Sequence, residues 1–219
     1  MGAMSNETRP LTQTPWDEID KRVRRVDEDR WISSRFAPAQ QRRALTALYA
    51  FNYELVRVQE AVSEQPLGLI RFQWWREAIN EIDEGRPARG HDVCLAIGEE
   101  VAAGRLKTGA LQKLVDGYQT AFVDQDRTKE PEGWVALTAA NILIPVHNWA
   151  EEIRGVSAAY AAARRKSGHA FGPHVSPAPK PLRPAVAHFR LRKLYCEGKV
   201  PNALSKRFSI MKAMNTGEV

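Results

Sequence analysis

Charged side chains stand at the end of an otherwise apolar stretch. Residues 37 to 60 read APAQQRRALTALYAFNYELVRVQE, and the last charges in this stretch are Glu54, Arg57 and Glu60. Whatever chemistry the protein performs, this polar end is therefore the natural place for a functional site.

Motifs for other chemistries are missing from the sequence. It has no Gly-rich phosphate loop, no H-E-x-x-H, no C-x-x-C and no G-x-S-x-G. Cys94 and Cys196 lie far apart, which indicates free thiols in a reducing compartment. His169 and His174 share a loop without further zinc ligands nearby. No nucleic-acid module is recognised, so we expect no nucleic-acid partner.

The element that must position the polar end is the stretch from residue 37 to 60, which we predict to be a central helix. Its apolar side chains occupy most of the helical circumference, which is typical of a helix enclosed by others. These side chains are Ala44, Leu45, Ala47, Leu48, Tyr49, Phe51, Leu55, Val56 and Val58. Pro38 suits its first turn.

The rest of the chain predicts further helices and no strand, so the expected fold class is all-α. The expected helices cover residues 14–30, 66–85, 92–103, 108–122, a stretch from 131 or 132 that is kinked at Pro145, 156–170 and 185–196. Residues 31–37 break the pattern. In the helix at 66–85, the apolar face is expected to contain Leu67, Ile70, Trp74, Ile79 and Ile82.

We expect one helical domain at residues 14–198, flanked by a disordered segment at 1–13 and a basic tail at 199–219. The domain contains a proline-rich loop at 168–184, with five prolines and two glycines. No apolar run reaches the ~18 residues of a membrane span. No secretory signal is expected, and the initial MGAM looks like a cloning scar.

Positive charge is concentrated at the C-terminal end of the chain. Residues 164–219 hold 12 Lys and Arg but 2 Asp and Glu, whereas the whole chain holds 32 and 26. The C-terminal part therefore carries +10 and the rest −4. This distribution suggests an anionic partner. The alternative is a solvated and partly disordered tail.

Several motifs together resemble the squalene/phytoene synthase family. They are RFAP at 35–38, RRA at 42–44, ALYAF at 47–51, IRFQWWRE at 70–77, LVDGY at 114–118 and, more weakly, LRP at 182–184. The similarity is best over residues 27–125. The resemblance implies an all-α isoprenoid-synthase-like bundle in which two prenyl diphosphates are joined head to head in a central cavity. Two aspartate-rich motifs on facing helices hold Mg²⁺ in that family.

The sequence departs from the family at both metal motifs. Counted from Phe51, the first motif falls on Val56, Arg57 and Glu60, so only Glu60 offers a carboxylate. At ~5 Å and an effective dielectric of ~20, one positive charge opposes Mg²⁺ by roughly 7 kcal/mol. The second motif belongs near 156–170, which contains no acid. The resemblance is thus to members that have lost both sites, among them a mitochondrial assembly factor for respiratory complex I.

The leading hypothesis is a non-catalytic scaffold or assembly factor without a cofactor. Its expected partners are a protein, a prenyl lipid in a residual cavity, or an anionic membrane surface contacted through the basic C-terminal end. The expected location is the cytoplasm with peripheral membrane contact, or the mitochondrial matrix in a eukaryote.

One alternative is a prenyl-diphosphate transferase with altered metal or diphosphate handling, and only this alternative would use Mg²⁺. Arg35, Arg57 and Arg71 would then bind diphosphate, with Tyr49 and Glu60 completing the substrate-binding set. For each arginine, an ordinary salt bridge to a neighbouring acid is the competing interpretation. The other alternative is a binder of membranes or nucleic acids that works through the basic end.

Overall fold

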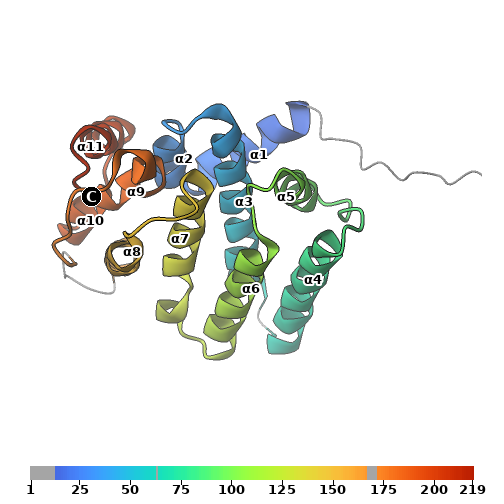
Figure 1. Ribbon diagram of the computed structural model, residues 1–219. Helices are drawn as coiled ribbons and strands as arrows, with labels where there is room; N and C mark the ends of the chain where they lie inside the picture. Colours follow the sequence, from blue (N-terminus) through green and yellow to red (C-terminus); the bar gives the residue numbers. More distant parts are fainter. Residues whose placement is uncertain (1–12, 63, 167–171) are drawn as a thin grey trace, which may run out of the picture.

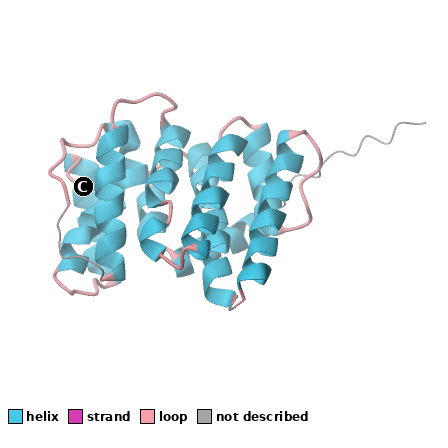
Figure 2. Cartoon of the chain, turned by 90° about the horizontal axis from the view of Figure 1, so that it is seen from below, coloured by secondary structure: helices cyan, strands magenta, loops and turns pink. Residues whose placement is uncertain are grey.

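The computed structural model describes residues 13–62, 64–166 and 172–219, and every regular element in these ranges is helical (Figures 1 and 2). The predicted all-α class is confirmed. The α-helices are α1 (Gln13–Val26), α2 (Glu28–Ser34), α3 (Ala39–Ala61), α4 (Gln65–Asp83), α5 (Asp92–Ala102), α6 (Thr108–Val123), α7 (Glu132–Leu143), α8 (Ala150–Arg165), α9 (Arg183–Val186), α10 (Arg192–Cys196) and α11 (Ala203–Thr216). Short 3₁₀ turns are η1 (Arg127–Lys129), η2 (Lys180–Leu182) and η3 (Ala187–Leu191).

Helix α3 is the central helix, as the sequence predicts. It packs against α1, α2, α4, α5, α6 and α7, and Figure 1 shows it between α4 and α5 on one side and α8 to α11 on the other. Phe51 is fully buried and meets Trp75 edge-on, with ring centroids 5.2 Å apart. Because α3 is apolar around most of its circumference, neighbours cover it on several sides.

The first expected helix is divided in two, which corrects the predicted range of 14–30. Asp27 leaves the helical conformation and caps α2, its carboxylate accepting the backbone N–H of Arg30 at 3.3 Å. Aspartate competes well for such a capping position. Residues 31–34, expected to break the pattern, therefore belong to α2.

Helix α4 buries only part of the face that was predicted, namely Ile79 and Ile82. Leu67 and Ile70 are 50% and 64% exposed, and Trp74 is only half-buried. Besides these two isoleucines, the buried face carries Phe72 and Trp75, together with Gly68 and Ala78. A β-carbon at Gly68 would lie 2.2 Å from the Phe122 ring, so this close approach to α6 fixes which face of α4 turns inward.

Helices α7 and α8 also differ from their predicted ranges. Helix α7 ends at Leu143, so the predicted kink at Pro145 falls outside it. Ile144 takes the extended conformation that a following proline favours. Helix α8 begins at Ala150, earlier than the predicted start at 156, and ends at Arg165.

The C-terminal end is folded, which corrects the expected free tail at 199–219. Helix α11 packs on η3 with Ile210 and Ala213 fully buried. The Asn202 side chain caps its first turn by accepting the Ser205 N–H at 2.9 Å. The single helix predicted at 185–196 is a succession of short turns, from α9 through η3 to α10.

The other predicted irregular segments lie partly or wholly outside the described residues. The disorder expected at 1–13 concerns almost entirely residues that the structure does not describe. Of the proline-rich loop at 168–184, residues 172–179 are irregular and residues 180–184 already belong to η2 and α9. No helix within the described ranges combines the length and apolarity needed to span a membrane.

Candidate functional site

A cavity of about 340 Å³ lies at the polar end of α3. Its walls come from α3, from the junction of α1 with α2, from η1 and the start of α7, and from the end of α8. The uncharged lining residues are Val26, Tyr49, Asn52, Tyr53, Val56 and Ala161. The charged ones are Asp27, Arg30, Glu60, Arg127, Glu130, Glu132, Arg164 and Arg165.

At the deep end of the cavity, a buried arginine lies between two carboxylates. Arg30 is 3% exposed and donates to the Asp27 carboxylate at 2.8 Å and, over a short contact, to Glu132. Arg164 of α8 approaches Asp27 from the other side, at 3.6 Å. The pKa of Asp27 is about 2: burial alone would raise it, but the charges of Arg30 and Arg164 outweigh burial.

The outer part of the cavity shows the same arrangement of alternating charge. Glu130 accepts from Arg127 at 2.6 Å and from Arg165 at 3.4 Å. Arg127 also lies 3.7 Å from Glu60 at the end of α3. Every carboxylate that lines the cavity therefore has an arginine partner. A diphosphate entering the cavity would have to displace a carboxylate from each guanidinium it met.

The residues at the two metal positions do not fit Mg²⁺. Of the first motif, Val56 and Glu60 line the cavity, but Arg57 points into a separate groove. On α8 the lining residues are Ala161, Arg164 and Arg165, so the second position presents cations. Within the described ranges, no three Asp, Glu, His or Cys side chains come together as a metal site. Mg²⁺ would need several oxygen ligands that the arginines do not already hold.

The predicted substrate-binding residues lie in three places. Tyr49 and Glu60 line the cavity. Arg35 lies at the opposite end of α3, beside α1, where it pairs with Asp20 at 2.8 Å. Arg57 and Arg71 share a groove of about 170 Å³ between α3, α4 and the start of α5. The five residues therefore do not form one diphosphate-binding set.

The competing salt-bridge interpretation applies to two of these arginines. Arg35 is paired with Asp20, and Arg57 lies 3.4 Å from Glu54. Arg71 is exposed and has no ion pair with any described residue.

Tyr49 has a buried hydroxyl group with no hydrogen-bond partner among the described residues. Its ring lies 5.7 Å from the Arg30 guanidinium. The pKa of Tyr49 is raised, because burial disfavours the phenolate more than Arg30 stabilises it. The hydroxyl is therefore a neutral polar group facing the cavity.

Sequence reasoning missed the buried polar pairs around this cavity. Arg30 and Asp27 lie in a region expected to be one plain helix. Asn52 lies inside the largely apolar stretch of α3, yet its carboxamide oxygen accepts from the Tyr118 hydroxyl at 2.8 Å. A polar residue inside such an apolar run is the signal that could have indicated a buried hydrogen bond.

Comparison with known proteins gives the same family as the motifs. The family model described as Squalene/phytoene synthase matches residues 23–139, which is more than half of the chain. No solved structure matches the chain.

Curated relatives carry the name NADH dehydrogenase (ubiquinone) complex I, assembly factor 6. The Homo sapiens protein is 30% identical over 123 residues, which is 55% of this chain and 37% of the human protein. The Bos taurus protein is 28% identical over the same shares. The Rattus norvegicus protein is 32% identical over 103 residues, or 47% of this chain and 31% of that protein. The match thus spans between 31% and 37% of the length of these relatives. On the family match, the chain belongs to the squalene/phytoene synthase family.

Proposed function

We propose that this protein is a non-catalytic member of its family and works as a scaffold or assembly factor through a protein partner. The observation that carries the proposal is that arginines are paired with the carboxylates in the cavity at the polar end of α3, where the family resemblance would place Mg²⁺ and diphosphate. Arg164 and Arg165 line the cavity from α8, and Arg30 is held between two acids. Relatives named as complex I assembly factors support a role in assembly.

The transferase alternative gains no support from the cavity, because its arginines are committed to carboxylates. Purified protein is incubated with farnesyl or geranylgeranyl diphosphate and Mg²⁺, and pyrophosphate and lipid products are measured. We expect no condensation. Release of pyrophosphate with a C30 or C40 product would refute the proposal.

A positive test uses cells that naturally contain the protein. Deleting its gene is expected to lower the amount of assembled complex I, as measured on native gels, and tagged protein is expected to co-purify with complex I subunits. A matched variant, Arg30→Met, tests whether complex I assembly depends on the cavity or only on the surface of the protein. If the cavity is only structural, any folded Arg30→Met protein should restore complex I. Normal complex I in the deletion strain would refute the assembly role.

We also propose that the protein contacts a membrane surface. Helix α11 contains no Asp or Glu, and residues 164–219 carry 12 Lys and Arg against 2 acids. Such a basic end is attracted to anionic lipid. This contact is compatible with either expected location, the cytoplasm or the mitochondrial matrix. A residual prenyl lipid in the cavity stays a prediction, which native mass spectrometry of protein from its own cells would test.

A further inference from the structure

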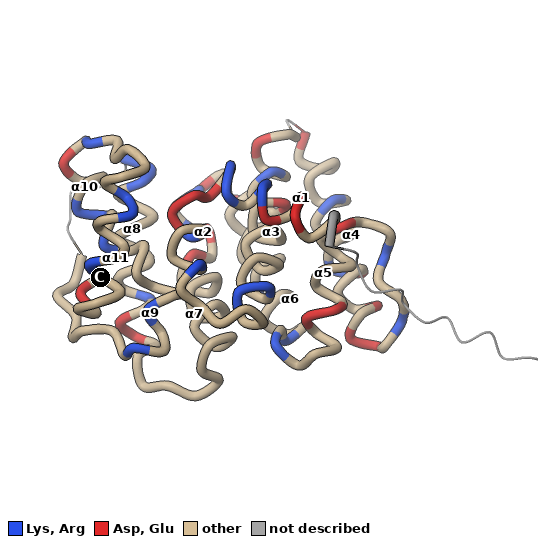
Figure 3. The backbone as a smooth tube through the Cα atoms, turned by 90° about the horizontal axis from the view of Figure 1, so that it is seen from above, with Lys and Arg blue, Asp and Glu red and all other residues tan. Residues whose placement is uncertain are grey.

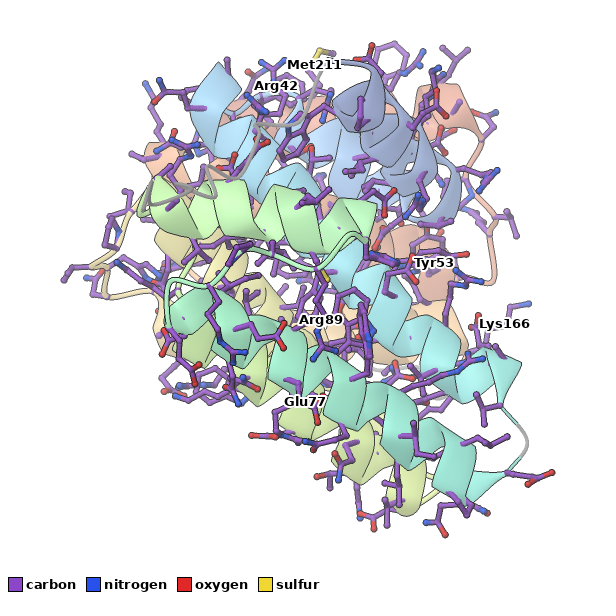
Figure 4. The ribbon with its side chains drawn as sticks, turned by 90° about the vertical axis from the view of Figure 1, so that its right-hand side faces the viewer. Arg42, Tyr53, Glu77, Arg89, Lys166 and Met211 are labelled. Atoms are coloured by element: carbon purple, nitrogen blue, oxygen red, sulfur yellow. The ribbon has the colours of Figure 1, made fainter. Side chains whose placement is uncertain are left out.

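The outer face of α11 exposes a row of large apolar side chains. Leu204, Phe208 and Met211 are 63%, 65% and 45% exposed. Their spacing of four and then three residues places them on one side of the helix. Val200, 86% exposed, precedes the helix. Figure 4 shows Met211 at the outer edge of the molecule. Each of these side chains keeps about half or more of its surface exposed in the described part of the chain.

The inner face of α11 holds the helix in a fixed orientation. Ile210 and Ala213 are fully buried against η3. Lys206 forms ion pairs at 2.9 Å with Glu28 and with Asp29, both on α2. Asp29 itself is 2% exposed, so this anchor reaches the interior. Because the inner face of α11 is packed, the apolar row on the opposite face is held pointing outward.

Unpaired cations flank the apolar row on both sides. By helical geometry, Arg207 lies beside one edge and Lys212 beside the other. Both are exposed, and neither forms an ion pair with a carboxylate in the described ranges. Figure 3 shows further Lys and Arg positions on the neighbouring α10. The pKa of Lys193 on α10 is lowered, first by partial burial and then by neighbouring positive charge.

We propose that this face of α11 is an interfacial helix that lies flat on an anionic lipid bilayer. Leu204, Phe208 and Met211 enter the boundary between headgroups and acyl chains, while Arg207 and Lys212 contact lipid phosphates. An apolar row with cations on both edges fits a surface that offers apolar depth and negative charge on every side. The inference rests on the membrane contact proposed above and assigns it to one helix face.

The experiment measures flotation of the full-length protein with vesicles of phosphatidylcholine, with and without phosphatidylglycerol. The test variant replaces Leu204, Phe208 and Met211 by Gln, which keeps helix propensity. The matched control replaces Leu67 and Ile70 by Gln, because these residues are equally exposed on α4, away from α11. Far-ultraviolet circular dichroism and thermal melts confirm that each variant is folded.

We expect the wild type and the α4 control to bind the anionic vesicles equally. The vesicle affinity of the α11 variant should fall at least about tenfold, because burial of these apolar side chains in the bilayer interface supplies most of the affinity. Arg207→Gln with Lys212→Gln should weaken binding by roughly thirtyfold, at about 1 kcal/mol per charge, and reduce its salt dependence.

Several results would overturn the inference. One is equal vesicle binding by the wild type and the folded α11 variant, and another is no preference for anionic lipid. A third is a wild-type dimer that the α11 variant abolishes without any vesicle binding, which would make the face a self-association surface. Complex I levels and condensation activity are measured in separate assays. A negative vesicle result can therefore be distinguished from a failure of the proposed function.

Discussion

Replacing Asp27 by Asn tests whether the paired charges of the cavity stabilise the fold. The substitution removes one negative charge from the deep end of the cavity. It keeps an oxygen that can still cap α2 by accepting the Arg30 N–H, so helix capping is not the variable. Arg30 is left with Glu132, and Arg164 loses its acidic partner in this cluster.

The magnitude follows from the pKa of the Asp27 carboxyl. Its ordinary value is 3.8 and its value in the fold is about 2, because the charges of Arg30 and Arg164 outweigh the effect of burial. At about 1.4 kcal/mol per pKa unit, the depression corresponds to about 2–3 kcal/mol. A depressed pKa means that the folded state favours the carboxylate. This stabilisation is therefore complete above about pH 5 and is lost as pH falls towards 2.

The assay is urea unfolding of wild type and Asp27→Asn at pH 7 and at steps down to about pH 3. We expect the variant to be less stable by about 2–3 kcal/mol at pH 7, with the difference shrinking as the pH falls. Asp116→Asn is the matched control: Asp116 pairs with Arg76 at 2.6 Å, but its side chain is 61% exposed, so its loss should be below about 1 kcal/mol. The reasoning is refuted if the Asp27→Asn difference does not change with pH, or if the control costs as much.

Three further outcomes are expected. Phe51→Ala should lower the free energy of unfolding by about 3–5 kcal/mol through lost burial and a cavity, and a denaturant titration showing less than about 1 kcal/mol would mean that α3 is not central. Tyr49→Phe should leave stability unchanged or raise it by up to about 1 kcal/mol, because the hydroxyl is buried without a partner; a clear loss in the same titration would reveal a missing hydrogen bond. Adding Mg²⁺ should not raise the melting temperature, since a ligand that binds the folded state stabilises it, and a concentration-dependent rise would contradict the assignment of the carboxylates to arginines.

The sequence predicted α3 well and α4 poorly, for a physical reason. Helix α3 is apolar on most sides, so no choice of face was needed. Helix α4 carries two apolar rows, one through Leu67 and Ile70 and one through Phe72 and Trp75. Periodicity cannot tell which row is buried. The choice depends on the contact between Gly68 and Phe122, which joins residues more than fifty positions apart.

At the C-terminal end, too, the sequence pattern could not show which apolar residues are buried. A basic composition suggested a free tail, but Ile210 and Ala213 at a spacing of three supply enough apolar surface for α11 to pack. Removing residues 199–219, the obvious way to test membrane contact from the sequence, would therefore uncover η3 as well. Point substitutions on the outer face of α11 avoid this problem because they leave Ile210, Ala213 and Lys206 in place.

At the candidate site, the positions of the first motif were predictable but their surroundings were not. Val56 and Glu60, counted along α3 from Phe51, line the cavity. The same count could not show that Arg57 turns into the groove beside α4. The buried pair of Asp27 and Arg30 depends on a helix break that local propensity did not reveal. These residues meet the η1, α7 and α8 side chains only through the tertiary fold.

The arginines of the cavity explain how several acids can be buried side by side at the end of α3. Carboxylates such as Asp27, Glu130 and Glu132 cannot be buried together unless positive charge compensates them. Arg30, together with Arg127, Arg164 and Arg165, supplies that charge through ion pairs. Replacing Arg57 by an acid would therefore not create a metal site in the cavity. The new carboxylate would face the α4 groove, and the acids in the cavity would stay bound to their arginines.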